Sequence, residues 1–452
     1  MDDAALISEE SGWQRFHTLI FMAFAVGASL EGFIYALSYV ATSWVTVPRI
    51  LTAVMVIWPP LWLLAGYGVS GPMADAIGRK KTFFVTFTLY MIGGLSLIAS
   101  YDYITLLFAI SVLLVAAGAD INMLTTTLNE LMPRIYRGRS LFLTLNFVNL
   151  GGIAPSVIAI MLRSSPQTQK LFVGAAALLV TSTLLVTRLK APESIMWLQQ
   201  KGSDKKAADE LSKYYSANTV SEAVTKARST EYGMQSKIGT GIRIAVSSLS
   251  NWAFTAGFSL GILVLGPYFF SSMTNDFIFV GGGIGFLAGL SGLFADKISR
   301  RYMLLASTAL VMMVSAVMLL TVGTWSSNPA LILFWALIII FSAAINIQYL
   351  SASALSSEIW PTHKRGTLTA VNNIVALGGV IPVLFFTQSL GLVQYMMVET
   401  GIWVVGLSAA VIWVIYGTET GQGRSVRMWE RSKSSATEEV SVSHQELDEN
   451  TL

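Results

Sequence analysis

The chain has 452 residues, of which 54% are hydrophobic and 12% are charged, and its formal net charge is +3. Soluble proteins carry about a quarter of their residues as charged side chains, so this composition excludes an ordinary soluble protein and favours one embedded in a bilayer. Because the chain has no cysteine and only three scattered histidines, we expect no disulfide, no metal site and no cofactor, and the small net charge indicates no nucleic-acid partner.

The acidic segment 1–16 precedes a series of apolar runs and lacks the basic start of a cleaved signal. Each run has roughly 20 residues, enough to cross the ~30 Å hydrocarbon core of a bilayer as a helix. The sequence therefore predicts an all-α membrane protein with twelve transmembrane helices, at residues 17–40, 50–71, 82–100, 104–128, 140–162, 170–188, 243–266, 275–294, 302–323, 329–350, 367–389 and 394–416.

The positions of the basic residues predict the orientation in the membrane. An even number of spans places both termini on one side. Of the 29 Lys and Arg residues, all but Arg49, Arg163 and Lys170 lie on the termini, on even-numbered connections or at the adjoining span ends. By the positive-inside rule that side is cytoplasmic. We expect a multi-pass plasma-membrane protein with both termini in the cytoplasm.

A polar, charged stretch from about Gln199 to Thr240 separates the sixth span from the seventh. It divides the chain into two groups of six spans. The predicted organisation is a cytoplasmic N-terminal segment (1–16), a six-helix bundle (17–190), a partly helical cytoplasmic linker (191–242), a second six-helix bundle (243–417) and a cytoplasmic tail (418–452).

The two groups of spans share an internal repeat. GPMADAIGRKK, residues 71–81, corresponds to SGLFADKISRR, residues 291–301, and NELMPRIYRG, residues 129–138, corresponds to SEIWPTHKRG, residues 357–366. PESIMWL at 192–198 has a weaker counterpart in TETGQGRS at 418–425. The matched pairs are Asp75 and Asp296, Arg79 and Arg300, Glu130 and Glu358, and Arg137 and Arg365. Parallel repeats of this kind build alternating-access carriers, in which the substrate site lies between the halves near the bilayer midplane.

The repeated segments carry a family resemblance over about residues 17–425. GxxxDxxGRK after the second span resembles the signature loop of the major facilitator superfamily, and ExxPxxxRG and PESIMWL resemble the sugar-porter and metabolite–proton symporter branches. The resemblance implies a twelve-helix transporter, not an enzyme. Two departures stand out. Ser299 replaces the glycine that matches Gly78, which predicts a less tight turn in the second half. NWAFTAGFS in span seven lacks the glutamine-rich pattern of sugar porters, which argues against a hexose.

An acid stands four residues before an arginine in both halves, and this spacing places both side chains on one face of a helix end. A carboxylate there can also accept hydrogen bonds from the N-terminus of a neighbouring helix. We therefore predict cytoplasmic latches that hold the halves together when the carrier faces outward, formed by Asp75, Arg79, Glu130, Arg137, Asp296, Arg300, Glu358 and Arg365. The alternative, that topology alone requires basic loops, is favoured for Lys80, Lys81 and Arg301.

Two acids lie well inside predicted spans. Glu31 in span one and Asp120 in span four are each ~12–14 Å from a span end, at 1.5 Å per residue. We find no Lys, Arg or His at comparable depth, so burial favours their neutral form and predicts a proton-coupling site for a neutral or cationic substrate. The span-one segment is similar to the DGFD pattern of aromatic-acid–proton symporters, with Ile34 in place of the second acid. The alternative is a carboxyl that only hydrogen-bonds neighbouring helices.

Amide and indole groups also interrupt the apolar spans, and a bare amide in lipid is costly. We predict that they line the substrate cavity, with hydrogen bonding between helices as the alternative: Asn146, Asn149, Asn251, Trp252, Asn346, Gln348, Asn372 and Asn373.

These features together predict a proton-coupled secondary transporter of a small neutral or cationic metabolite, such as a sugar, polyol or other organic molecule. Its expected partners are that substrate, protons and the lipid bilayer, and we expect a monomer. One alternative is an uncoupled organic-cation facilitator. Another is a transporter-like nutrient sensor, which the tail of 35 residues after Gly417 disfavours, because such receptors carry longer extensions.

Overall fold

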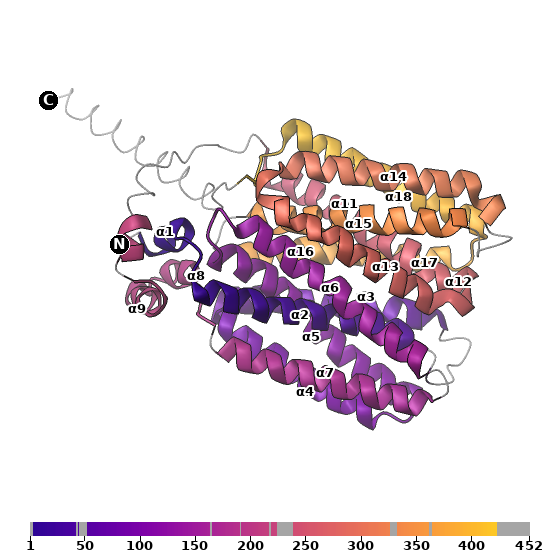
Figure 1. The fold of residues 1–452 in the computed structure, drawn as a ribbon, viewed down its shortest axis with the longest axis horizontal. Helices are drawn as coiled ribbons and strands as arrows, with labels where there is room; N and C mark the ends of the chain where they lie inside the picture. Colours follow the sequence, from indigo (N-terminus) through magenta and orange to yellow (C-terminus); the bar gives the residue numbers. More distant parts are fainter. Residues whose placement is uncertain are drawn as a thin grey trace.

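The computed structural model describes residues 3–41, 44, 52–162, 165–189, 191–216, 218–223, 238–325, 332–360 and 364–422. Within these ranges the protein is helical and contains no strand (Figure 1). Several positions used in the sequence predictions lie outside the described residues, namely Arg49, Arg163, linker residues 224–237 and tail residues 423–452.

The first six long helices are α2 (Arg15–Val40), α3 (Thr52–Ile77), α4 (Arg79–Ala99), α5 (Tyr103–Leu131), α6 (Arg137–Met161) and α7 (Pro166–Leu189). Five of them have the length and apolar character of membrane spans. The remaining helix of the six, α3, has 26 residues and a single charged side chain, Asp75. At 1.5 Å per residue it is ~39 Å long, more than a hydrocarbon core requires.

Six further segments follow the linker, and each is long and apolar enough to span a membrane. Three of them are interrupted or extended by short elements that the hydropathy profile does not reveal. They are α11 (Thr240–Phe258) with the π-helical turn η3 (Ser259–Val264) and α12 (Leu265–Phe269); η4 (Ser271–Met273) with α13 (Thr274–Gly289) and η5 (Leu290–Lys297); α14 (Arg300–Trp325); α15 (Ile332–Glu358); α16 (Arg365–Gly378) with α17 (Val380–Thr387); and α18 (Leu392–Tyr416). The predicted twelve-helix, all-α class is confirmed.

The helices form two bundles that lie side by side, α2–α7 coloured from indigo to magenta and α11–α18 from rose through orange to yellow (Figure 1). Helix α6 packs against α13 and α3 packs against α16, so these pairs form the boundary between the bundles. Close approach of α6 and α13 requires glycine: a Cβ on Gly285 would lie 2.9 Å from Asn149 Oδ1. A smooth glycine surface therefore sets the spacing at this boundary.

Three short helices pack at one end of the bundles: α1 (Asp3–Glu10), α8 (Ile195–Gln200) and α9 (Asp204–Tyr214) (Figure 1). Helices α8 and α9 share a small apolar core that includes Ile195, Leu198 and Ala207, and α1 packs against both helices. Trp197 Nε1 donates a hydrogen bond to the carbonyl of Asp75, at 3.1 Å, and so ties this cluster to the end of α3. We call this end of the molecule the linker face and the other end the far face.

Candidate functional site

A cavity of about 130 Å³ lies between the two bundles. At ~10–15 Å³ per water-sized group, it has room for roughly ten such groups, about the size of a monosaccharide. The lining contains one carboxyl, and among the described residues that line it there is no Lys, Arg or His. The polar and aromatic side chains of the lining are Glu31, Tyr35, Tyr67, Thr125, Asn149, Asn251, Phe254, Thr255, Phe258, Ser342, Asn346, Tyr349, Ser353, Ser356 and Asn373.

Four of the eight residues predicted to line the cavity do so, and two of them join the bundles across it. Asn149 of α6 donates from Nδ2 to Asn346 Oδ1 of α15 at 2.6 Å, and Asn346 Nδ2 donates to the carbonyl of Gly285 at 2.6 Å. Asn251 and Asn373 form a longer contact of 3.5 Å within the second bundle. The amides thus offer donors and acceptors to a polar ligand from both bundles.

The other four predicted lining residues lie outside the lining: Asn146, Trp252, Gln348 and Asn372. The three amides among them make hydrogen bonds between helices, the alternative considered from the sequence. Gln348 Nε2 donates to the carbonyl of Ser250 at 3.1 Å. The carbonyl oxygen of the Asn372 side chain accepts from the hydroxyls of Ser247 and Ser248, each at 2.8 Å. These contacts satisfy polar groups that would otherwise be buried without partners.

Glu31 of α2 lies in the lining of the cavity. Its Oε2 atom is buried and makes no hydrogen bond to any described residue. Tyr35, one turn further along α2, lines the cavity beside it. A carboxyl without a basic partner in a water-accessible cavity can take up and release a proton as its surroundings change.

Asp120 differs from the prediction, because it has a cationic partner. Arg188, in the last turn of α7, donates from both terminal nitrogens to the two carboxylate oxygens of Asp120, and the Nη2–Oδ2 bond is 2.9 Å. Both side chains are buried. The expectation that no basic residue reaches this depth is therefore wrong. Helix α5 continues to Leu131, so Asp120 lies farther from its end than predicted, and the long Arg188 side chain points back into the bundle.

The Asp120–Arg188 pair lies beside the cavity and not in its lining. The Arg188 guanidinium lies over the ring of Phe83, 4.2 Å from its centroid. The pair packs against Gly27 of α2, where an added Cβ would lie 3.1 Å from Asp120 Oδ2. Gly27 precedes Glu31 by one helical turn, so the ion pair packs against α2 one turn away from the cavity acid.

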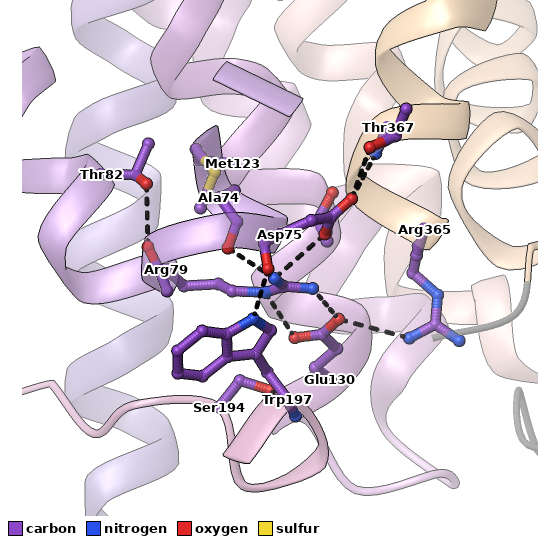
Figure 2. Close-up of polar contacts among 12 residues, drawn as sticks. Ala74, Asp75, Arg79, Thr82, Met123, Glu130, Ser194, Trp197, Arg365 and Thr367 are labelled. Atoms are coloured by element: carbon purple, nitrogen blue, oxygen red, sulfur yellow. Dashed lines mark hydrogen bonds and ion pairs between the residues drawn. The ribbon is translucent and has the colours of Figure 1, made fainter. Parts of the chain in front are cut away.

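At the linker face, Arg79 holds two acids of the first bundle (Figure 2). Its Nη2 and Nε atoms bind the two carboxylate oxygens of Glu130, at 2.8 and 3.0 Å, and its Nη1 atom binds Asp75 Oδ1 at 3.1 Å. Arg79 and Glu130 are fully buried. A two-pronged arginine–carboxylate pair is a strong and geometrically specific contact.

The same acids also reach the second bundle (Figure 2). Asp75 Oδ2 accepts hydrogen bonds from the backbone nitrogen and the hydroxyl of Thr367, at 2.9 and 2.6 Å. Thr367 is in the first turn of α16, where the helix dipole favours a negative charge. Arg365 Nη1 lies 3.8 Å from Glu130 Oε1. These contacts join the bundles at the linker face.

The second copy of the repeat makes the equivalent contact in the opposite direction. Asp296 Oδ1 accepts from the backbone nitrogen of Arg139 at 3.0 Å, in the first turn of α6. Within the second bundle, Arg300 Nε lies 3.6 Å from Glu358 Oε2. Each bundle therefore presents an acid to the start of a helix in the other bundle.

Arg137, the remaining residue of the predicted latches, has a partner that the sequence did not indicate. Its Nη2 atom donates to Glu9 Oε1 of the N-terminal helix α1 at 2.7 Å. The neighbouring Glu10 binds Arg134 at 3.1 Å, and the backbone nitrogen of Arg134 donates to the carbonyl of Glu9 at 2.8 Å. Segment 1–16 thus contributes buried acids to the linker face.

The third and weakest pair of repeated segments, 192–198 and 418–425, contributes one acid from each half, and the two acids make equivalent contacts. Glu193 Oε1 accepts from the backbone nitrogens of Arg79 and Lys80, at 3.0 and 3.3 Å, at the start of α4. Glu419 Oε1 accepts from the backbone nitrogen of Arg300 at 2.9 Å, at the start of α14. Burial raises the pKa of Glu193 above its ordinary value, and hydrogen bonds from backbone amides act in the opposite direction.

The turns that precede α4 and α14 have different backbone conformations. Gly78 has φ of +100°, a conformation that favours glycine. In the second half, Ile298 is extended, with φ of −99° and ψ of 139°, so the chain enters α14 without a left-handed residue. Serine is compatible with this path, and the Ser299 hydroxyl binds Glu419.

Comparison with known proteins identifies the family. Residues 19–384 match the sequence model of the Major Facilitator Superfamily. The chain is 27% identical over 337 residues to the putative metabolite transport protein YwtG of Bacillus subtilis, covering 70% of this chain and 72% of that protein. It is 24% identical over 355 residues to the glucose transporter GlcP of Staphylococcus epidermidis, covering 72% and 75%. The proton:xylose symporter XylE bound to 6-bromo-6-deoxy-D-glucose superposes with a TM-score of 0.73 at 15% identity, over 91% of this chain and 98% of that chain. The chain therefore belongs to the Major Facilitator Superfamily and is a transporter, not an enzyme.

Proposed function

We propose that the protein transports an uncharged, hydroxyl-rich metabolite of monosaccharide size together with protons, and binds it in the cavity between the bundles. The observation that supports this most directly is the cavity lining, whose described residues combine amides from both bundles, aromatic rings and one carboxyl, without a basic side chain among them. Amides donate to and accept from hydroxyl groups, while aromatic rings pack on apolar sugar faces. GlcP is a glucose transporter and XylE is a proton:xylose symporter, and both sugars belong to this size class.

Glu31 is the proposed proton-coupling group. It is the acid of the cavity lining, and its free oxygen faces no base among the described residues. Binding a proton removes the charge from the cavity, and losing it restores an unpaired charge that favours a different arrangement of the bundles. Asp120 takes part as the partner of Arg188, and this ion pair packs against α2 at Gly27, one turn before Glu31.

We further propose that the linker face is cytoplasmic and that its contacts act as the latches predicted from the sequence. The bundles of residues 17–190 and 243–417 then move as two units. Contacts of Asp75 with Thr367, Glu130 with Arg365, and Asp296 with Arg139 join the units when that face is closed. They part when the cavity opens to the cytoplasm. The proposed location is the plasma membrane, with both termini cytoplasmic and the protein monomeric.

Uptake into proteoliposomes tests the function. Radiolabelled pentoses, hexoses and polyols are offered with and without an inward pH gradient, and a protonophore collapses the gradient in a parallel sample. We expect accumulation of one of these compounds above its outside concentration only with the gradient. Glu31→Gln should retain exchange and lose accumulation. Gradient-independent uptake by the wild type, or unchanged accumulation by Glu31→Gln, contradicts the proposal.

The same lining supports a second candidate, an uncoupled organic-cation facilitator. Glu31 lies among aromatic rings that include Tyr35, Tyr67 and Tyr349, and such rings attract cations over their faces. Uptake of a quaternary ammonium compound that follows the membrane potential and ignores the pH gradient would favour this function. Glu31→Gln should then abolish binding altogether, whereas a coupled porter retains exchange of its neutral substrate.

A further inference from the structure

A third acid lies inside the membrane-spanning part of the protein, and neither the cavity nor the linker face uses it. Glu399 follows the first residue of α18, Leu392, by seven positions, so it is ~10 Å from that helix end. It is 1% exposed. Trp403 Nε1 donates to Oε1 at 3.0 Å, whereas Oε2 is buried and has no hydrogen-bond partner among the described residues.

No described basic residue lies near this carboxyl. Helix α18 packs against α14, where the Ser315 and Thr400 hydroxyls meet at 3.0 Å. Arg300 and Arg301 lie at the start of α14, ~22 Å along the helix axis from Ser315. The remaining charged groups of the neighbouring helices, Arg243 of α11 and Glu358 of α15, are also at the linker-face ends. On the far-face side, Tyr395 lies one turn before Glu399 with Tyr268 beside it, and Asp276 lies in the first turn of α13, which packs against η3.

Glu399 faces the π-helical turn η3. A Cβ on Gly261, within that turn, would lie 3.4 Å from Glu399 Oε1. Tyr395, one helical turn earlier on α18, donates from its hydroxyl to the carbonyl of Leu260 at 2.6 Å. Single π-helical turns within α-helices are uncommon and frequently mark functional positions. Two polar side chains on one face of α18 therefore meet the backbone of η3.

The turn η3 is continuous with the part of span seven that lines the cavity. Phe254, Thr255 and Phe258 line the cavity on α11, and η3 begins at Ser259. Any change in how η3 packs on α18 thus moves a helix whose preceding turn contacts the substrate site. Glu399 itself lies outside the lining, so it can act on the cavity only through this helix.

We propose that Glu399 is a second proton-binding site, separate from Glu31, whose protonation holds η3 against α18. In its neutral form the carboxyl packs beside Gly261 with one hydrogen bond from Trp403. When the proton leaves to water at the far face, an unpaired carboxylate remains against the backbone of η3, and this cost favours separation of η3 from α18. The far-face half of span seven then opens in response to pH.

The indole of Trp403 gives a direct readout of this site. We expect the fluorescence contribution of Trp403, obtained as the difference between the wild type and Trp403→Phe, to change with pH. The change should persist with Glu31→Gln and with Tyr395→Phe, a matched change on the same face of α18, and should be lost with Glu399→Gln. A contribution that does not vary with pH, or that still varies with Glu399→Gln, overturns the proposal.

Thiol labelling measures the opening itself, because the chain has no cysteine. Ser259, at the start of η3, is fully buried, so Ser259→Cys reports exposure of this turn. The ratio of its labelling rate to that of the same protein with Glu399→Gln cancels the titration of the thiol. This ratio should rise with pH. A ratio that stays constant overturns the proposal. Glu399→Asp keeps the acid, so the labelling rate of Ser259→Cys with Glu399→Asp should depend on pH as it does with Glu399, if charge and not packing causes the effect.

Discussion

Replacement of Asp75 by asparagine tests whether the linker-face contacts hold the bundles together. The change keeps the size of the side chain and removes its charge. Asp75 is 17% exposed and accepts two hydrogen bonds from the first turn of α16, at 2.9 and 2.6 Å, besides its ion pair with Arg79. It therefore connects the two bundles through charge-assisted bonds to a helix N-terminus.

The magnitude follows from these contacts. Hydrogen bonds to charged groups contribute about 1.5–3 kcal/mol and neutral ones about 0.5–1.5 kcal/mol. Since asparagine retains one acceptor, we expect the closed linker face to lose ~1–2 kcal/mol, which includes the lost attraction to the helix dipole. At about 1.4 kcal/mol per factor of ten, the population with an open linker face should rise roughly 5- to 30-fold.

The assay uses the cysteine-free chain. Ser353 lines the cavity on α15, five residues before the linker-face end of that helix, so Ser353→Cys reacts with a thiol reagent when the linker face opens. Labelling should accelerate by the same factor in Asp75→Asn. Asp102→Asn is the matched control, because Asp102 caps α5 within one bundle, through Thr105. Equal labelling of wild type and Asp75→Asn, or equal acceleration by Asp102→Asn, would refute the reasoning.

Three other changes test contacts that the structure revealed. Arg188→Ala leaves Asp120 buried without its partner and should lower the free energy of unfolding by about 3–5 kcal/mol, seen as a lower thermal midpoint in detergent. Glu9→Gln removes the charge that binds Arg137 at 2.7 Å and should free this arginine for other acids at the linker face, so that Ser353→Cys labels more slowly. Gly78→Ala imposes strain at φ of +100° and should lower the unfolding free energy by more than ~1 kcal/mol.

Each of these predictions has its own control. Asp120→Asn combined with Arg188→Gln removes both charges and should restore most of the lost stability; if it does not, the ion pair is not the cause. Glu10→Gln changes the neighbouring acid, whose partner Arg134 is 21% exposed, and should alter labelling less than Glu9→Gln does. Ser299→Ala occupies the equivalent turn without a left-handed residue and should cost less than Gly78→Ala. A reversed order in either comparison contradicts the structural explanation.

The sequence by itself determined the architecture, the family and the pairing of repeated residues. Each span must be helical and apolar, because lipid offers no partner for an open backbone, so hydropathy predicts where the helices lie but not where they are interrupted. The duplicated segments predicted which acids and arginines correspond, and Asp75 and Asp296 do make equivalent contacts with the start of a helix in the other bundle. Glu193 and Glu419 were detectable in the same way, from the weakest element of the repeat.

Only the tertiary structure decided which polar residues meet. Whether an amide faces the cavity or a neighbouring helix depends on its direction around the helix axis and on how closely the helices pack, as Asn149 and Asn372 illustrate. Arg188 stands at a helix end in the sequence, yet its long side chain reaches back to Asp120. Glu9 and Arg137 are 128 positions apart and meet only because the N-terminal helix folds onto the linker face. Hydropathy records how apolar each segment is, whereas these pairings depend on side-chain reach and on contacts between helices that are distant in the chain.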